Sequence, residues 1–433
     1  MKVAFYTLGC KVNAYETEAI REQFISAGYE IVDYSGFSDI YIVNSCMVTN
    51  SGERKSKQII RRPNKINPDG IIIVMGCLSQ LKAEQMLKLP GVKIVLGTKN
   101  RHKIIEYLDE YLNKKTPLNK SEVLSNTEEF ENLIINDFKN HKRAFLKIQD
   151  GCNNFCSYCI IPFTRGRIRS KSKEIILQET KSLVKKGHIE IVLTGIHTSG
   201  YGKDLDNYSF ADLLKEIETI DGLKRIRISS IEVSELDKEL LSIIKNSKKI
   251  VNHLHIPLQS GNNRILKLMN RKYNKNDFKV KIEEIRKAFN QDIAITTDVI
   301  VGFPSETEAE FNEMYDFIEM LNFQELHVFP YSRRKGTSAD KMKDQINGKI
   351  KKQRVNKLIK LSEKLKKNYI KSQLSSSKKV IIEQLKGEYL FGHSRDYLSI
   401  LVKGNKEFLG KEVKVILEKE EFPNVIAKFK NAL

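Results

Sequence analysis

Three of the six cysteines of this 433-residue chain lie in the stretch Cys152-Asn153-Asn154-Phe155-Cys156-Ser157-Tyr158-Cys159. A loop with this Cys-x3-Cys-x2-Cys spacing can direct three thiolates at one small group. Closely spaced thiolates favour soft partners, and iron–sulfur clusters are held in this way. Three ligands leave one coordination position open, which is typical of a catalytic rather than a structural metal site. A zinc site with a distant fourth ligand and a reducible disulfide are the alternatives, and the sequence favours the cluster.

The other three cysteines each follow a predicted strand. Apolar strands are predicted at residues 3–8, 39–44 and 71–75, and helices alternate with them. This pattern is typical of a parallel sheet with both faces covered. Cys10, Cys46 and Cys77 then lie at the carboxyl edge of that sheet, where ligands bind. Cysteine is often simply buried, but three at one edge predict a second three-thiolate cluster, again with an open position. We also expect Asn13 and Glu16 to cap the first helix reciprocally.

A longer series of strands and helices follows in the middle of the chain. Strand-like runs are predicted at residues 144–148, 190–193, 225–229, 252–256, 293–301 and 325–329. Six strand–helix units in series predict an open or partial (β/α) barrel with its chemistry at the carboxyl ends of the strands. The cysteine loop at residues 152–159 follows the first of these strands. The predicted fold class is therefore α/β.

Several residues after these strands are candidates for binding a cofactor. Gly195 would let the backbone approach a ligand closely, and the carboxylate of Glu232, in the segment that begins at Ser229, could accept ribose hydroxyls. Gln259 follows the fourth strand, and Tyr158 would line the cofactor side of the cysteine loop. For each of these residues, a turn or a cap is the structural alternative.

Four basic side chains near the barrel mouth are further candidates. His255 follows the fourth strand, although a packed histidine is its commoner role. Arg165, Arg167 and Arg169 follow the cysteine loop. Arginine binds carboxylate or phosphate in a bidentate manner, so these three residues could bind a cofactor carboxylate or a substrate phosphate. A solvated basic turn is the alternative.

The last quarter of the chain has features of a nucleic-acid-binding module. A helix predicted over residues 349–371 carries ten basic residues and one acid, which favours a surface that faces phosphates. Short strands are predicted at residues 380–385, 389–394, 397–402, 412–417 and 425–429. Five short strands indicate a small barrel of the oligonucleotide-binding kind. The alternation of Phe391, His393, Arg395 and Tyr397 would suit contact with RNA.

The composition also favours a polyanionic partner. The chain has 74 Lys and Arg residues against 54 Asp and Glu residues, a net charge of +20. Nucleic acid attracts such a chain because each phosphate contact releases counterions. The apolar runs are far shorter than the roughly 18 residues of a membrane-spanning helix, and the N-terminus lacks a secretory pattern. We therefore expect a cytoplasmic protein with reduced thiols and no membrane partner.

With these motifs together, the chain resembles the radical S-adenosylmethionine (SAM) methylthiotransferases from end to end. Residues 152, 156 and 159 match the radical motif of the family, and residues 10, 46 and 77 match its three N-terminal cluster ligands. Residues 7–13, 44–49 and 193–197 are similar to the branch that modifies threonylcarbamoyladenosine beside the tRNA anticodon.

The resemblance implies a domain order and a reaction. It implies an N-terminal methylthiotransferase domain at residues 1–112, a linker at 113–141, a radical-SAM partial barrel with the basic helix at 142–372 and a TRAM-like RNA-binding β domain at 373–433. Two 4Fe-4S clusters and SAM would serve as cofactors. A 5′-deoxyadenosyl radical would enable removal of hydrogen from C2 of N6-threonylcarbamoyladenosine at tRNA position 37. The second cluster would present the methylated sulfur, and a second SAM would supply its methyl group. The implied partners are tRNA, an electron-donor protein and a sulfur source.

Other substrates and another class of function remain as alternatives. The same chemistry acts on isopentenyladenosine in tRNA in one branch of the family and on a ribosomal-protein aspartate in another. A protein substrate would favour an acidic C-terminal surface, so the net charge of +20 counts against it. A non-catalytic RNA-binding metalloprotein would have closed sites with four ligands, whereas each cysteine set here offers three.

Overall fold

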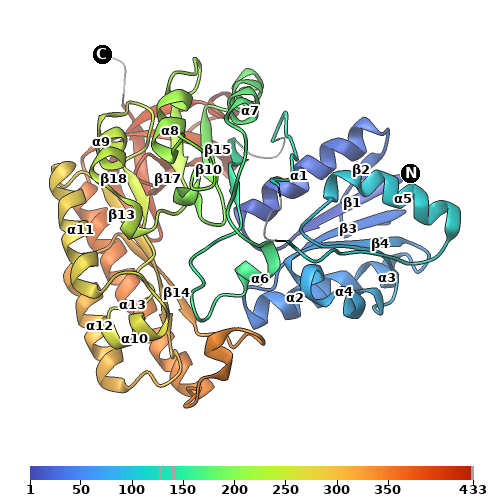
Figure 1. The fold of residues 1–433 in the computed structure, drawn as a ribbon. Helices are drawn as coiled ribbons and strands as arrows, with labels where there is room; N and C mark the ends of the chain where they lie inside the picture. The colour runs from blue at the N-terminus through green and yellow to red at the C-terminus, as the bar shows by residue number, and fades with distance from the viewer. Residues whose placement is uncertain (126–128, 139–141, 431–433) are drawn as a thin grey trace.

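The computed structural model describes residues 1–125, 129–138 and 142–430. Figure 1 shows an N-terminal α/β unit on one side of the molecule and a strand–helix series with a small C-terminal β unit on the other. The short helix α6 (Ile161–Arg165) lies between the two sides. No helix in the described ranges is long and apolar enough to cross a membrane.

The N-terminal unit is built on a six-stranded parallel sheet in the order β2-β1-β3-β4-β5-β6. Its strands are β1 (Lys2–Thr7), β2 (Glu30–Val32), β3 (Ile40–Ser45), β4 (Ile71–Gly76), β5 (Val92–Leu96) and β6 (Leu118–Lys120). Its helices are α1 (Lys11–Ser26), α2 (Asn50–Arg61), α3 (Pro63–Ile66), α4 (Cys77–Leu87) and α5 (Ile104–Lys114). Every residue of β3 and β4 is buried, as expected for central strands covered on both faces. The three strands that precede the cysteines, β1, β3 and β4, are neighbours in this sheet.

The start of α1 differs from the prediction. The helix begins at Lys11 after Cys10, which makes no side-chain cap. The Asn13 amide instead donates to the carbonyls of Leu8 (2.7 Å) and Ser45 (3.3 Å). Glu16 is fully buried among basic side chains. The reciprocal cap is therefore wrong, because tertiary partners take both side chains.

The middle of the chain forms the expected parallel strand–helix series. Two three-stranded sheets, in the orders β7-β10-β11 and β12-β13-β14, are joined by a parallel bridge between Ile226 and Ile250. The strands are β7 (Arg143–Lys147), β10 (Glu190–Thr194), β11 (Arg225–Ile228), β12 (His253–His255), β13 (Ala294–Val301) and β14 (Glu325–Pro330). The helices are α7 (Lys173–Lys185), α8 (Phe210–Glu218), α9 (Lys238–Asn246), α10 (Asn263–Leu268), α11 (Lys275–Ala288) and α12 (Glu308–Leu321). A short antiparallel pair, β8 (Gln149–Asp150) and β9 (Arg169–Ser170), brackets the cysteine loop. The α/β fold class is confirmed.

The C-terminal β unit is the expected closed barrel of five strands. Its order is β15-β16-β17-β19-β18. The strands are β15 (Ser377–Lys386), β16 (Tyr389–Ser394), β17 (Ser399–Lys403), β18 (Glu412–Glu421) and β19 (Asn424–Phe429). It has an apolar core of its own, to which Ile370 at the end of α13 (Gly348–Gln373) contributes.

Three of the side chains expected to contact RNA instead face the strand–helix series. Arg395 donates to the carbonyls of Lys248 (2.8 Å) and Ile250 (3.0 Å). The ring of His393 stacks on that of Tyr397, with centroids 4.8 Å apart, and Tyr397 lies beneath the guanidinium of Arg227 at 4.6 Å. The RNA interpretation is therefore wrong for Arg395, whose guanidinium joins the two units, and for His393, whose ring nitrogens contact Glu383 and Ser399 of its own barrel.

The charge of the basic helix α13 is partly structural. Four of its basic side chains pair with acids on neighbouring elements: Arg354 with Glu306 and Glu308, Lys357 with Glu308, Lys364 with Glu319, and Lys366 with Glu325. The sequence shows the excess within the helix but not the acids that lie opposite it. Exposed basic residues such as Lys352, Lys360 and Lys371 remain on the outer face.

The segment expected to be a linker, residues 113–141, contains ordered structure. Strand β6 pairs with β5 in the N-terminal sheet. Leu133, Ile135 and Phe138 are buried in the core that also includes residues of β1 and β7. Residues 126–128 and 139–141 of this segment lie outside the described ranges. The division into domains remains a prediction.

A buried ion network joins the N-terminal unit to the strand–helix series. Glu16 of α1 pairs with Arg101 (2.6 Å), Lys147 of β7 (2.7 Å) and Arg165 of α6 (2.8 Å). Asp150 accepts from Lys147 (2.6 Å) and Arg165 (3.1 Å). Burial alone would raise the pKa of Glu16, but the surrounding cations hold that pKa well below its usual range. The network therefore contains charged groups whose partners come from both units.

Replacing Glu16 with Gln should destabilise the protein strongly. The substitution keeps the shape but leaves three buried cations without their shared anion, and breaking a buried pair costs about 3–5 kcal/mol. Urea unfolding followed by circular dichroism measures this loss at pH 7. A depressed carboxyl pKa stabilises the folded state above the unfolded pKa and ceases to do so as the pH falls through the folded pKa. The difference from wild type should therefore shrink only in strong acid.

The matched control is Glu84→Gln, which changes an exposed acid on α4. Its effect should stay below about 0.5 kcal/mol. Equal effects of the two substitutions would show that the network does not stabilise the junction.

Candidate active site

The three N-terminal cysteines converge at the carboxyl ends of β1, β3 and β4. Gly9 has a φ of +103°, and a Cβ added there would lie 3.0 Å from the Cβ and 3.2 Å from the Sγ of Cys46. Only glycine therefore allows the chain before Cys10 to pass so close to Cys46. Burial raises the pKa of the Cys46 thiol to about 11, and the nearby thiols of Cys77 and Cys10 act in the same direction. The sulfurs of Cys10 and Cys77 are thus close enough to affect the ionisation of Cys46.

Arg165 connects this cysteine set to the buried ion network. Its Nε atom donates to Cys77 Sγ at 3.3 Å, while its Nη atoms contact Glu16 and Asn13. A donor of this kind stabilises negative charge on a thiolate ligand.

The second cysteine set lies in the loop that follows β8. Gly151 precedes it with a φ of +71°, where a Cβ would lie 1.8 Å from the carbonyl oxygen of Arg167. The Ser157 amide donates to the Met269 carbonyl at 3.0 Å, which fixes the middle of the loop against the end of α10. Burial, followed by the neighbouring Cys156 thiol, raises the pKa of Cys159 to about 12.

Two basic side chains contact the sulfurs of this loop. Arg271 donates to Cys156 Sγ at 3.3 Å and forms an ion pair with Glu232. Burial lowers the pKa of His197, but hydrogen bonds to Cys152 and Glu235 outweigh it and raise that pKa to about 9. Cationic donors beside thiols favour the thiolate form that binds metal.

Both cysteine sets have the donor chemistry of iron–sulfur ligation. All six thiols are free of disulfides, each set offers three sulfurs, and each set receives an N–H donor from a buried arginine. The raised pKa values of Cys10, Cys46 and Cys159 mean that metal binding must displace protons from these thiols. The residues present therefore fit two clusters.

A cavity of about 640 Å³ lies beside the N-terminal cysteine set and is lined by Cys10. One wall is formed by Gly9, Cys10 and Lys11, and the opposite wall is formed by the carboxyl ends of the barrel strands, including Gly195 and Ser229. A second cavity of about 230 Å³ is lined by Tyr158, Cys159 and Gln259. Asp298 and Phe329 line both cavities, so the two spaces adjoin.

The predicted cofactor residues are distributed over three places. Gly195 and Ser229 line the larger cavity, and Tyr158 and Gln259 line the smaller one beside Cys159. Glu232 pairs with Arg271 next to Cys156. A Cβ at Gly195 would lie 2.8 Å from the side-chain oxygen of Gln149. The group that lies closest to Gly195, and that leaves little room for a larger residue there, is therefore a side chain of the protein.

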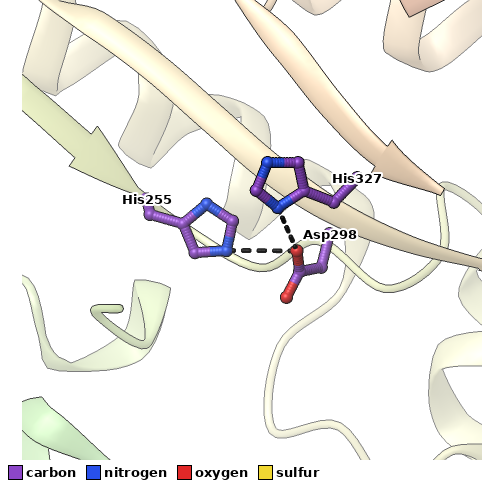
Figure 2. Close-up of side chains that lie close together, drawn as sticks. All are labelled: His255, Asp298 and His327. Atoms are coloured by element: carbon purple, nitrogen blue, oxygen red, sulfur yellow. Dashed lines mark ion pairs between the residues drawn. The ribbon is translucent and has the colours of Figure 1, made fainter. Parts of the chain in front are cut away.

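A cluster of two histidines and an aspartate lies on the wall of the larger cavity. Figure 2 shows the rings of His255 and His327 next to each other, both directed at one carboxylate oxygen of Asp298. Asp298 Oδ1 is 3.2 Å from His255 Nε2 and 3.3 Å from His327 Nδ1. His255 Nδ1 also contacts Thr296 Oγ1 at 2.9 Å. Two imidazoles and a carboxylate form a donor set that suits zinc or iron, but here the carboxylate already pairs with both rings.

Comparison with known proteins identifies the family. The N-terminal residues 2–97 match the model described as uncharacterized protein family UPF0004, and residues 146–318 match the radical SAM superfamily. The threonylcarbamoyladenosine tRNA methylthiotransferase MtaB of Bacillus subtilis (strain 168) is 47% identical over 97% of this chain and 94% of its own. The protein of the same name from Aquifex aeolicus (strain VF5) is 38% identical over 96% of this chain and 100% of its own. This chain belongs to the radical SAM methylthiotransferase family.

Other relatives of this chain are named for a different tRNA nucleoside, dimethylallyladenosine. A tRNA-2-methylthio-N(6)-dimethylallyladenosine synthase of Clostridium tetani (strain Massachusetts / E88) is 37% identical over 95% of this chain and 93% of its own. Among solved structures, the radical SAM methyltransferase TsrM of Kitasatospora setae aligns with a TM-score of 0.57 at 12% identity, over 78% of this chain and 73% of that one. That likeness supports the fold alone. Membership of the superfamily implies SAM and an iron–sulfur cluster in this methylthiotransferase.

The prediction that the arginines after the cysteine loop bind a cofactor carboxylate or a substrate phosphate is partly wrong for this methylthiotransferase. Arg165 is completely buried in ion pairs, and Arg169 is buried beside Asp150. Arg167 is exposed and lies over the ring of Phe155 at 4.6 Å. Two of the three arginines therefore cannot reach a phosphate from outside, because buried acids already bind them.

Sequence reasoning also missed Asp298, His327 and Arg271 as contributors to the site. Asp298 and His327 are register partners on β13 and β14. Their positions on the last predicted strands were a usable signal, because neighbouring parallel strands bring such residues together. Arg271 gave no such signal, since its contact with Cys156 spans 115 residues.

Replacing Asp298 with Asn should lower the pKa of His327. The hydrogen bond that His327 donates to the Asp298 carboxylate raises that pKa above its ordinary value, so loss of the carboxylate charge removes the main cause. Histidine-selective NMR titration of the full-length protein measures the shift. Asp69→Asn, at an exposed turn of the N-terminal unit, is the control. An unchanged His327 pKa in the Asp298 variant would contradict the shared ion pair.

Proposed function

We propose that this enzyme adds a methylthio group to C2 of N6-threonylcarbamoyladenosine at position 37 of tRNA, using two 4Fe-4S clusters and SAM. The observation that carries the proposal is the 47% identity, along 97% of the chain, to a relative named for that substrate. Relatives named for dimethylallyladenosine also align along the chain, for example at 37% identity.

The lining of the larger cavity favours the same substrate. A dimethylallyl group is a hydrocarbon and would gain most from an apolar wall. The wall of this cavity includes apolar side chains such as Ile228 and Phe329, but Lys11, Arg227, His255, Asp298 and His327 also place charged and polar groups around the space. A carbamoyl-threonine group carries a carboxylate, a hydroxyl and amide groups, which such a wall can satisfy by hydrogen bonding.

The six cysteines would hold the two clusters. Cys152, Cys156 and Cys159 would bind the cluster that also binds SAM, and Cys10, Cys46 and Cys77 would bind the second one. When bound, these groups supply the radical chemistry that opens a C–H bond and the sulfur that replaces the hydrogen. Arg271 and Arg165 each donate to a cysteine sulfur of one set, and these bonds would orient the ligand and stabilise its charge.

The two adjoining cavities support a division of roles among the other residues. Tyr158 and Gln259 lie beside Cys159 and would contact SAM. Gly195, Ser229 and Glu232 would complete the cofactor site from the neighbouring strand ends. Cys10 lines the larger cavity, so the target adenosine would lie there, next to the cavity that Cys159 lines. The base must leave its stack to enter, which is easiest in a single-stranded loop of RNA.

The proposal also assigns partners. The net charge of +20 and the exposed lysines of α13 favour tRNA as the polyanion. Radical SAM chemistry needs an electron-donor protein, and repeated turnover needs a sulfur source. A tRNA substrate places the enzyme in the cytoplasm, as the reduced thiols also predict.

Cluster content should follow the two cysteine sets. Anaerobically reconstituted wild-type enzyme should hold ~8 iron atoms per chain, whereas Cys46→Ala and Cys156→Ala should each hold ~4. Cys46→Ala should still cleave SAM but form no methylthio product, and Cys156→Ala should lose both activities. Iron analysis and product chromatography measure these quantities. Full iron content in Cys46→Ala, or one or two zinc ions in wild type, would contradict the two-cluster proposal.

The nucleosides of tRNA from a strain that lacks this protein decide the substrate. Mass spectrometry should show loss of methylthiolated threonylcarbamoyladenosine and accumulation of threonylcarbamoyladenosine itself. Methylthiolated isopentenyladenosine should be unchanged and serves as the internal control. The reverse pattern would assign the enzyme to the other tRNA branch.

A further inference from the structure

We propose that Lys11 binds the carboxylate of the amino-acid group on the target adenosine and so selects the substrate. This inference rests on the proposed function, because it assigns a subsite within the same cavity. It concerns a contact of the chain with substrate and not with a cluster.

Lys11 is placed to reach a ligand in the cavity. It is the first residue of α1 and follows Cys10, whose thiol lines the same space. Its side chain is exposed and belongs to the cavity wall. A group bound between Cys10 and the strand ends of the barrel would therefore lie beside this ammonium group.

Lys11 differs from the other charged residues of the cavity wall. Those side chains already have ionic partners: Arg227 with Glu190 at 2.8 Å, Asp298 with His255 and His327, and Glu325 with Lys366 at 3.0 Å. Within the described ranges, the ammonium group of Lys11 has no ion pair and no side-chain hydrogen bond. Among the described residues of this wall, Lys11 is thus the one cation without an ionic partner.

The surroundings of Lys11 favour an anion. Its ammonium group interacts electrostatically with the guanidinium groups of Arg227 and Arg143, with Tyr397 and with the carboxylate of Glu190, which is already paired with Arg227. Of these, Arg143 also approaches Glu383 at 3.1 Å. A carboxylate that enters beside Lys11 would pair with it and lessen its repulsion from the neighbouring cations. The threonyl carboxylate is the one anionic group of the modified nucleoside apart from its phosphates.

Binding of three RNAs to the reconstituted full-length enzyme tests this assignment. The RNAs are the same anticodon stem-loop with threonylcarbamoyladenosine, with its carboxyl methyl ester, or with unmodified adenosine. Fluorescence anisotropy should show that wild type prefers the free acid to the ester by about 10- to 100-fold, the range for a hydrogen bond between charged groups. Lys11→Met should lose this preference, and Lys11→Arg should keep most of it.

Control variants separate the carboxylate contact from other effects. Lys186→Met changes an exposed lysine after α7 and should bind all three RNAs as wild type does. Iron content and circular dichroism verify folding, and Lys11→Gln provides a second neutral variant, which should also lose the preference for the free acid.

Two results would overturn the subsite. One is an undiminished preference for the acid over the ester in both Lys11→Met and Lys11→Gln. The other is an equal loss of affinity for all three RNAs in these variants, which would show that Lys11 binds a backbone phosphate. If wild type bound the modified and unmodified RNAs equally, the proposed function would fail, and the subsite would fail with it.

Discussion

The buried ion pair between Glu16 and Arg165 is the contact on which the geometry of the site depends. Glu16 belongs to the helix that begins directly after Cys10, and Arg165 belongs to the short helix after the cysteine loop. The same guanidinium also donates to Cys77. Arg165, which belongs to the radical SAM part of the chain, therefore contacts both Glu16 of α1 and the sulfur of Cys77 in the other cysteine set. Charged groups removed from water hold strict positions, because each of them is costly to leave unpaired.

The sequence correctly predicted those features that depend only on local residue pattern and on strand topology. Alternating apolar strands and helices predicted a parallel sheet, and parallel strands have their carboxyl ends at one edge. That reasoning located Cys10, Cys46 and Cys77 together although they are far apart in sequence. The five strands of the C-terminal barrel followed equally from turn residues and short apolar runs. In each case the signal lay within about ten residues of the element it described.

Prediction from the sequence failed where a side chain has a partner that lies far away along the chain. Glu16 satisfied a local capping rule, yet its partner Arg165 lies 149 residues away. The acids that neutralise α13 come from other elements, so the helix seemed more available to RNA than it is. His393 and Arg395 resembled an RNA-facing row because the sequence does not show which face of a barrel is covered. Such contacts are decided by the packing of whole units, which no local window contains.

Through Tyr397, the C-terminal barrel forms part of the candidate site. The ring of Tyr397 lies under Arg227 and forms part of the wall of the larger cavity. The wall of this cavity therefore includes a residue that the ribosome adds some 240 residues after Cys159. A nascent chain that already contains both cysteine sets still lacks part of the wall of the larger cavity. Synthesis itself would thus delay a complete cavity until the C-terminal barrel has been made.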